Sequence, residues 1–203
     1  TLSQGFGDGF SGKRGVPFPC EAPHHLNQPD LSIVATLTEA IHKRKAVQIT
    51  YVSLSSGETV REIVPHTLVD NGLRWHVRAY DRLQQAFRDF VLTRVKQCAL
   101  LTEPTVNESE QSTNDEQWNS IISLELVPHP NLTHKEAITL DYAMVDGLKT
   151  VQVRAAMAGY LLRLWNVDCS ADHHLTGAEY QLWLRNSACL AMAHNALLAA
   201  GMR

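Results

Sequence analysis

The stretches Arg74-Trp-His-Val-Arg-Ala-Tyr-Asp81 and Phe87-Arg-Asp-Phe-Val-Leu-Thr-Arg-Val95 read as two β-strands separated by a short turn. Residues of the first stretch alternate between apolar and polar, and this period of two is typical of a strand with one buried face. The apolar side consists of Leu73, Trp75, Val77 and Ala79. The polar side consists of Arg74, His76, Arg78 and Tyr80. We therefore expect a solvent-exposed sheet face that is cationic and aromatic.

The charge of this region differs in sign from that of the whole chain. Between positions 74 and 96, six Lys or Arg residues and two Asp residues give a local net charge of +4, whereas the 203-residue chain carries −3. A basic and aromatic face favours an anionic ligand with planar rings, such as a nucleotide or a nucleic-acid strand. The alternative is an ordinary sheet surface on which Asp81 and Asp89 pair with the arginines.

The segments around this region predict one helix and a small sheet. The helix is expected to begin at Asp30 or Ser32 as its N-cap and to end at the basic residues 43–45. Strands are expected at residues 47–53, 59–69, 74–80 and 87–101. The second strand is expected to bend at Pro65, and Asn71-Gly72 is a hairpin signal. One helix followed by antiparallel strands predicts a curled sheet or a partly open barrel.

The composition changes at residues 102–117, where acidic side chains are not balanced by any Lys or Arg. We place a domain boundary in this linker. The expected division is an arm at residues 1–29, a first domain at 30–101, the acidic linker at 102–117 and an α+β domain at 118–203. In the last domain, Thr133-His-Lys-Glu136 predicts a capping box. Residues 155–165 and 187–200 read as helices, the second of them ended by Gly201.

The remaining motifs predict no catalytic, metal or cofactor site. Gly7-Asp-Gly-Phe-Ser-Gly12-Lys13 is similar to a phosphate-binding loop, but Arg14 replaces the required Ser or Thr and Pro17 blocks the following helix. Metal-capable side chains form two clusters: Asp168, Cys169, Asp172, His173 and His174, and Cys20, His24 and His25. Neither cluster has the ligand spacing of a zinc site. Cys98 precedes an apolar run and is interpreted as a buried structural thiol.

The bulk properties indicate a folded chain with a core. Hydrophobic residues make up 44% and charged residues 19%, so wholesale disorder is not expected. No apolar run approaches the roughly 18 residues of a membrane span. The four cysteines show no pairing pattern, which predicts reduced thiols and a cytoplasmic location.

Eight polar side chains on neighbouring predicted strands are candidate ligand-binding residues. They are Tyr51, Ser53, Arg61, His66, His76, Arg78, Arg88 and Arg94. Arginine offers planar, bidentate donors for phosphate, and Tyr and His can stack on a base. Arg88 and Arg94 lie six positions apart and would share a face in an unbroken strand.

These segments together resemble a WYL domain over residues 32–101. The likeness comprises residues 47–53, Arg61 with Pro65-His66, residues 74–81 and residues 87–94. Of the Trp-Tyr-Leu triplet that names the family, only Trp75 is kept, because His76 and Val77 stand at the other two positions. Residues 126–130 and 153–163 resemble the C-terminal extension that follows WYL domains in bacterial transcription regulators. The likeness is greatest to repressors of phage-defence operons.

The resemblance implies an Sm/SH3-like β-barrel with an N-terminal helix, followed by a small α+β C-terminal domain. It also implies a homodimer that binds operator DNA through a winged helix-turn-helix and senses a nucleotide or nucleic-acid ligand. Residues 1–31 are too short and too rich in Gly and Pro for that DNA-binding domain, so we expect it upstream of Thr1. By position, the implied pocket comprises Tyr51, Ser53, His66, Arg78 and Arg94. Weaker candidates are Arg61, His76 and Arg88, with Trp75 as support beneath the pocket.

The sequence therefore predicts the ligand-sensing and dimerisation part of a transcriptional repressor, without enzymatic activity or cofactor. The C-terminal helices are expected to supply dimer contacts through Leu190, Leu197 and Leu198. The alternative is a stand-alone module that binds single-stranded nucleic acid on the barrel surface, with steep salt dependence.

Overall fold

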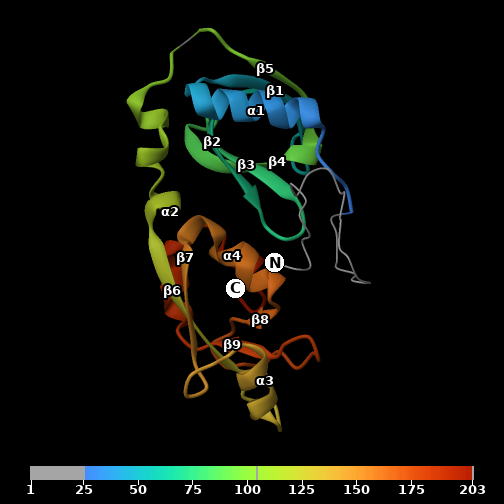
Figure 1. Cartoon of the computed structure of the whole chain (residues 1–203), viewed down its shortest axis with the longest axis vertical. Helices are drawn as coiled ribbons and strands as arrows, with labels where there is room; N and C mark the ends of the chain where they lie inside the picture. Colours follow the sequence, from blue (N-terminus) through green and yellow to red (C-terminus); the bar gives the residue numbers. More distant parts are fainter. Residues whose placement is uncertain (1–25, 104, 203) are drawn as a thin grey trace, which may run out of the picture. The chain divides into compact units, whose positions relative to one another are not determined.

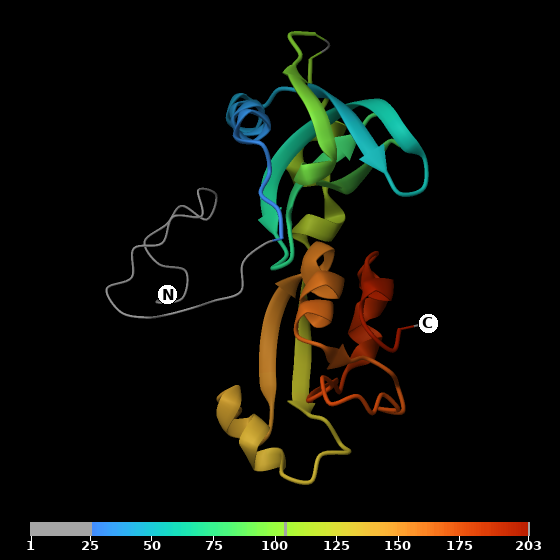
Figure 2. The same ribbon diagram turned by 90° about the vertical axis from the view of Figure 1, so that its right-hand side faces the viewer.

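The computed structural model describes residues 26–103 and 105–202. The chain divides into two compact units, Thr1–Gln111 and Ser112–Arg203, which are treated separately below. Figures 1 and 2 show the elements of both units from two directions. The loop-like motif at residues 7–13 and the cluster of Cys20, His24 and His25 lie outside the described residues.

The first unit is one helix packed on a five-stranded antiparallel sheet. Its elements are α1 (Leu31–Lys43), β1 (Val47–Ser53), β2 (Gly57–Asp70), β3 (Trp75–Asp81), β4 (Ala86–Val91), η2 (Leu92–Arg94) and β5 (Val95–Leu100). The strand order is β4-β3-β2-β1-β5. Because β4 and β5 are the two edges, the sheet is curled but not closed (Figure 2). The expected α+β fold is confirmed, with a barrel that is open.

Helix α1 follows from its cap and its apolar stripe. The Asp30 carboxylate accepts a hydrogen bond from the backbone N–H of Ser32 at 2.7 Å, as expected for the N-cap. Ile33, Leu37 and Ala40 recur at helical spacing and are buried against the sheet. The helix ends at Arg44, which adopts the left-handed conformation of a C-cap with φ 52°.

Two local signals in the sheet behave as the sequence predicts. The connection after β2 is held by the Asn71 side chain, whose Oδ1 accepts hydrogen bonds from the backbone N–H groups of Leu73 and Arg74 at 3.0 Å. Gly72 has φ 81°, a conformation that glycine adopts without strain. The register between β2 and β3 shifts between Pro65 and Thr67, so the strand bends at Pro65.

The strand expected at residues 87–101 is wrong as a single element, because η2 interrupts it. Leu92 at the start of η2 is completely buried in the core of the first unit. This turn lets the chain pass from β4 at one edge of the sheet to β5 at the other. The Tyr51 hydroxyl accepts a hydrogen bond from the Val91 N–H at 3.3 Å and ties β1 to the end of β4. The core of the first unit therefore includes contacts between β1 and β4, which are not neighbours in the sheet.

The acidic segment after β5 is held against the first unit by Arg82. The guanidinium donates to Glu110 Oε1 at 2.7 Å and Oε2 at 2.9 Å, and to Glu62 Oε2 at 3.1 Å. It also donates to the carbonyl of Thr105 at 3.2 Å. Glu110 belongs to η3 (Glu108–Glu110) and is buried. We call this network the Arg82 clamp; it fixes the chain up to the end of the first unit.

The second unit combines a four-stranded sheet with short helical segments. Its elements are η4 (Ser112–Asn114), α2 (Glu116–Asn119), β6 (Ile121–Pro128), α3 (Lys135–Asp141), β7 (Lys149–Arg154), α4 (Ala155–Leu164), β8 (Val167–Asp168), β9 (Leu182–Leu184), η5 (Ser187–Met192) and η6 (Ala196–Leu198). The strand order is β7-β6-β9-β8, and only β8 and β9 are parallel. Buried side chains of β6 alternate along the strand and pack with Leu162 of α4.

Two helix predictions in this unit need correction. The capping box at Thr133 does not form: α3 begins at Lys135 with His134 as N-cap, and no side chain caps it. Residues 187–200 do not form one helix but the two short turns η5 and η6. The Asn195 side chain accepts a hydrogen bond from the Gly159 N–H at 3.1 Å and donates to the Ala156 carbonyl at 2.6 Å. These two hydrogen bonds attach Asn195 to α4. Asn195 lies between η5 and η6, so the bonds fix the segment where the helix is interrupted.

No helix in the described part of the chain is long and apolar enough to cross a membrane.

Candidate ligand-binding face

The register of β3 with its neighbours decides which candidate residues lie together. His76, Arg78 and Tyr80 pair across the ladder with Val91, Asp89 and Phe87 of β4. Because directly opposite residues share a face, these six side chains form one surface, which we call the β3–β4 face. The opposite face carries Val77 and Ala79, which lie in the core.

The β3–β4 face is not the wet surface that alternation predicts. Arg78 is 5% exposed and His76 is 2% exposed. The Arg78 guanidinium lies 3.1 Å from Asp89 Oδ1, its cross-strand partner. His76 Nδ1 lies 3.1 Å from the carbonyl oxygen of Arg74. Partners for both polar groups are thus available within the sheet itself, which makes their burial possible.

A second buried pair joins Arg61 to Asp81 on the other side of the sheet. The Arg61 guanidinium lies 2.5 Å from Asp81 Oδ2, and its Nε donates to Thr59 Oγ1 at 3.0 Å. Asp81 is completely buried and also accepts a hydrogen bond from the Leu83 N–H. Asp81 and Asp89 thus do pair with arginines, as the alternative interpretation expected, but both pairs are buried and do not lie on a solvated sheet surface. Each of these guanidiniums is held in one orientation by its carboxylate.

Aromatic side chains extend the β3–β4 face toward the bend in β2. The ring of Phe87 lies edge-on to the rings of Tyr80 and His66, with centroid distances of 5.2 Å and 5.8 Å. His66 Nδ1 lies 2.9 Å from Thr67 Oγ1, and Thr67 is the β2 partner of Arg78. These rings are partly exposed, so they offer flat apolar surface beside the Arg78–Asp89 pair.

Of the eight predicted residues, His66, His76 and Arg78 come together on this face. Arg94 is near enough to His76 to act on its ionisation. Tyr51 is buried in the core, where its ring lies edge-on to Phe90. The Ser53 hydroxyl lies 3.1 Å from that of Ser55 at the β1–β2 turn.

Arg88 is exposed and pairs in the ladder with Ala79, so it projects from the side of β4 opposite Asp89. The expectation that Arg88 and Arg94 share a face of one strand is wrong, because η2 intervenes. In the β1–β2 ladder, the side chains of Tyr51, Ser53 and Arg61 lie on one and the same face of the sheet. The predicted residues therefore fall into two groups on opposite faces of the sheet.

Burial controls the ionisation of His76. Desolvation lowers the pKa of this imidazole, and the positive charges of Arg74 and Arg94 lower it further. The negative charge of Asp89 acts in the opposite direction but does not reverse the shift. At neutral pH the His76 side chain is therefore neutral within the face.

A pH-dependent loss of stability is expected from His76. The imidazole has an ordinary pKa of 6.5 in the unfolded chain and a lower pKa when folded. The unfolded state therefore takes up the proton first as the pH falls, and the folded state loses stability below the ordinary pKa. From about pH 7.5 to about pH 5.5, urea denaturation should show a smaller loss for His76→Gln than for the unmodified chain. An exposed control, His134→Gln, should behave like the unmodified chain; equal losses in all three proteins would contradict the assignment.

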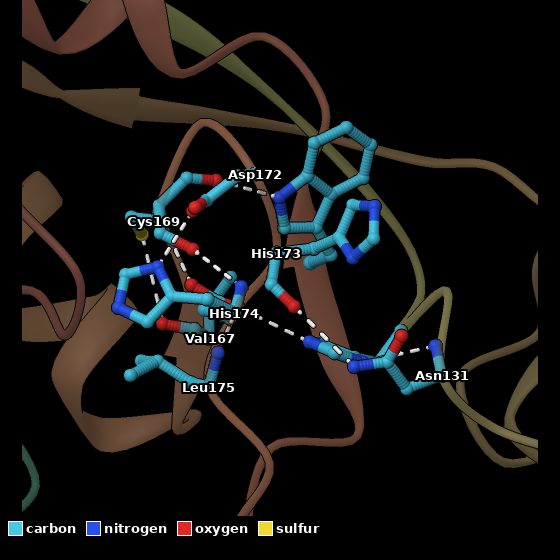
Figure 3. A network of polar contacts seen from close by, with 11 residues as sticks. Asn131, Val167, Cys169, Asp172, His173, His174 and Leu175 are labelled. Atoms are coloured by element: carbon cyan, nitrogen blue, oxygen red, sulfur yellow. Dashed lines mark hydrogen bonds and ion pairs between the residues drawn. The ribbon is translucent and has the colours of Figure 1, made fainter.

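The second unit contains a separate polar network around Asp168 (Figure 3), and the sequence predicted neither its contact with His129 nor its hydrogen bonds with the loop amides. The buried Asp168 carboxylate accepts hydrogen bonds from the backbone N–H groups of Ser170 at 2.7 Å and Leu175 at 3.2 Å. His129 Nε2 lies 3.1 Å from the same carboxylate. The Asn131 N–H donates to His129 Nδ1 at 3.3 Å, which places the imidazole proton on Nε2.

Burial acts to raise the pKa of Asp168, but hydrogen bonds from Ser170, His129 and Leu175 outweigh it and lower the pKa. His173 and His174 project in different directions in Figure 3, and His174 Nδ1 lies 2.6 Å from Asp172 Oδ1. Within residues 26–103 and 105–202, no three His, Cys, Asp or Glu side chains converge to hold a metal ion. The hydrogen bonds that Asp168 accepts fix the loop after β8.

Comparison with known protein families identifies both units. Residues 32–100 match the WYL domain, and residues 121–190 match the C-terminal dimerization domain of the BrxR transcriptional regulator. The chain is therefore a WYL-domain protein that also carries a C-terminal dimerization domain of the BrxR type. The resemblance seen in the sequence is thus confirmed for both parts.

Within that class, the chain is similar to DNA-binding transcriptional repressors named CapW. It is 34% identical to the protein of Escherichia coli (strain KTE188) over 167 residues, which are 81% of this chain and 54% of the relative. The protein of Pseudomonas aeruginosa is 37% identical over 139 residues, covering 67% and 45% of the two chains. The chain thus spans about half the length of these relatives. Among solved structures, proteasome accessory factor B/C of Arthrobacter aurescens is similar to this chain with 18% identity and a TM-score of 0.39. The match covers 95% of this chain and 29% of that protein's chain.

Proposed function

We propose that this chain is the effector-sensing and dimerisation part of a homodimeric transcriptional repressor. The observation that carries this proposal is the presence of a WYL domain and a dimerization domain in one chain. Operator DNA would be bound by a domain outside these residues. By the resemblance to repressors of phage-defence operons, the regulated genes would serve antiviral defence. A catalytic role is not part of the proposal, because the relatives are named as repressors.

The effector in this proposal is a nucleotide or a single-stranded nucleic acid bound at the β3–β4 face. His66, Tyr80 and Phe87 offer ring surfaces on which a base can stack, and stacking contributes about 1–3 kcal/mol per base. Arg78 and Arg94 supply positive charge beside these rings for a phosphate. The neutral His76 is buried on the same face, where the charge of Arg94 acts on its ionisation.

The other predicted residues take supporting roles in the proposal. Tyr51 holds the end of β4 in place through its hydroxyl, so it positions the face from the core side. Arg61 is committed to Asp81 within the fold and does not contact the effector. Ser53 and Arg88 belong to the other side of the sheet and could contact only a ligand that extends around its edge.

The Arg78–Asp89 pair gives the face two states. An anionic effector must compete with Asp89 for the guanidinium, so binding would release Asp89 and shift β4 relative to β3. Effector binding can shift the equilibrium between these two states only by as much as the effector's affinities for the two states differ. A buried pair also resists weak, unspecific anions, because they do not offset the desolvation of the separated charges.

The test is a fluorescence anisotropy titration of this chain with single-stranded DNA, single-stranded RNA and cyclic and linear nucleotides. An effector-sensing domain is expected to bind one class at least about tenfold more tightly than the others. If none of the probes binds, the sensing part of the proposal is wrong.

The stand-alone nucleic-acid-binding module makes a different prediction in the same titration. It would bind DNA and RNA strands of any sequence, with affinity falling steeply as salt rises, at a slope of about −0.7 per phosphate contacted. Arg61 and Arg78 are both neutralised by aspartates, which leaves less free positive charge for such binding. This observation favours the selective sensor.

A further inference from the structure

Three large apolar side chains of the second unit remain in solvent around the end of α3. Leu140 is 79% exposed and Val145 is 75% exposed, and Tyr142 between them is also exposed. Helix α3 buries only one of its side chains, Ile138. A helix of this length is marginal in water without tertiary contacts, so its exposed apolar side suits contact with another surface.

A groove begins beside these side chains. It has a volume of about 590 Å³ and is lined by Ala143, Val145, Asp146, Leu148, Lys149, Thr150 and Arg185. The lining combines apolar side chains with both signs of charge, from Asp146 on one hand and Lys149 and Arg185 on the other. Figure 2 shows α3 in the connection at one end of the β6–β7 pair. Apart from Arg185, the residues that line the groove lie between the end of α3 and the start of β7.

The segment that presents Val145 is tightly constrained. Val145 and Leu148 exchange two backbone hydrogen bonds, at 3.1 Å and 2.9 Å, across a turn that contains Asp146 and Gly147 with positive φ. The Val145 side chain is therefore held outward by a closed turn. A side chain that is already ordered loses little conformational entropy on binding, so it is a favourable anchor.

We propose that Leu140, Tyr142, Val145 and the adjoining groove, together called the α3–β7 corner, are the surface through which two copies of this chain associate. This inference rests on the proposed function, which requires a dimer. All residues of the corner lie within the segment that matches the dimerization domain, residues 121–190. In a two-fold contact one patch meets itself, so an apolar projection beside a groove can fill the partner's groove while receiving the partner's projection. The opposite charges around the groove pair in the same way across the axis.

A second exposed apolar patch competes for this role. Met192 of η5 and Leu197 of η6 are exposed, and Leu197 is 73% exposed. The expectation that Leu190 contributes to the dimer is wrong, because it is buried in the core of the second unit. Met192 and Leu197 follow the matched segment, which ends at residue 190. Their position favours the α3–β7 corner as the dimer contact.

The test compares dissociation constants by sedimentation velocity over a dilution series. Leu140→Asp combined with Val145→Asp places charges in the apolar centre and is expected to weaken the dimer at least about 100-fold. Leu197→Asp is the matched control, with the same chemistry at an equally exposed leucine, and should dissociate like the unmodified chain. If the double variant dimerises normally, or if Leu197→Asp dissociates, the corner is not the interface. If the unmodified chain is monomeric throughout, the proposed function itself fails.

Cysteine protection provides a measurement that needs no charge in the interface. In a Cys20→Ser background, Val145→Cys should react with a maleimide at least about tenfold more slowly at dimer than at monomer concentrations, whereas Leu197→Cys should react equally at both. The three remaining native thiols give little background, because burial raises the pKa of Cys98 to about 11, that of Cys169 to about 12, and that of Cys189 as well. Protection of Leu197→Cys instead of Val145→Cys would overturn the proposal.

Discussion

Arg82→Ala is expected to lower the free energy of unfolding of the first unit by about 3 kcal/mol, at the lower end of the range for a broken buried ion pair. The guanidinium makes two parallel hydrogen bonds to Glu110 and a third to Glu62. Glu110 is buried, and its hydrogen bonds with Arg82 and the Asn107 N–H hold its pKa below the ordinary value although burial acts to raise it. Without Arg82 this carboxylate would be left in the fold without its counter-charge.

Hydrogen exchange in a urea series resolves the effect by unit. In Arg82→Ala, the amides of the first unit should lose protection at lower urea, and those of η3 should exchange fastest because the clamp no longer holds them. The matched control is Lys96→Ala, which removes a cation from Glu58 in an exposed pair of the same unit. Exposed pairs contribute about 0–1 kcal/mol, so the control should change little. Equal effects of the two substitutions would refute the clamp.

Asp168→Ala is expected to lower the free energy of unfolding of the second unit by about 4 kcal/mol, because each buried donor left without an acceptor costs about 1–3 kcal/mol. The carboxylate accepts hydrogen bonds from the N–H groups of Ser170 and Leu175 and lies against His129 Nε2. All three donors would lose their acceptor at once. The loop after β8 should then lose its attachment to the sheet.

Thermal unfolding and hydrogen exchange measure this loss. Asp168→Asn is the conservative variant, since its amide oxygen can still accept from one or two of the donors, and it should cost less than half as much. Asp172→Ala is the exposed control, because its carboxylate lies mostly in solvent beside the surface imidazole of His174 and should be replaceable with little effect. The structural role of Asp168 would be refuted if Asp168→Ala were as stable as Asp172→Ala.

Local signals in the sequence predicted the elements of the first unit but not the environment of their side chains. The Asp30 cap, the Asn71-Gly72 turn and the bend at Pro65 each depend on residues close in sequence, and each is present in the structure. The alternation along β3 correctly assigned Val77 and Arg78 to opposite faces of the sheet. It could not show that Arg78 is buried, because that depends on Asp89 in the next strand.

The second unit shows where local signals fail. Thr133 has the right spacing from Glu136 for a capping box, yet the helix begins later and no side chain caps it. Residues 187–200 have an apolar pattern typical of a helix, but contacts of Asn195 with α4 divide the segment into two turns. In the segment at residues 187–200, tertiary contacts outweigh propensities of a few tenths of a kcal/mol per residue.

The candidate site was only partly predictable for the same reason. Local sequence cannot distinguish the two faces of the sheet for residues on different strands, so Arg61 and Arg78 were expected together although they lie on opposite faces. The Arg82 clamp was missed because its partner Glu110 is far along the chain. The acidic composition of residues 102–117 indicated a linker but not the carboxylate within it that is buried.

The most direct test of the central claim is to titrate the chain and three variants with whichever probe binds most tightly in the anisotropy experiment. If the β3–β4 face holds the effector, Arg78→Ala with Arg94→Ala should weaken binding about 100-fold, since each charge-assisted contact contributes about 1.5–3 kcal/mol. Asp89→Asn should tighten binding, because it removes the carboxylate that competes for Arg78. Lys43→Ala, which removes an exposed cation of α1, should leave the affinity unchanged. Unchanged affinity in the double arginine variant would contradict the account.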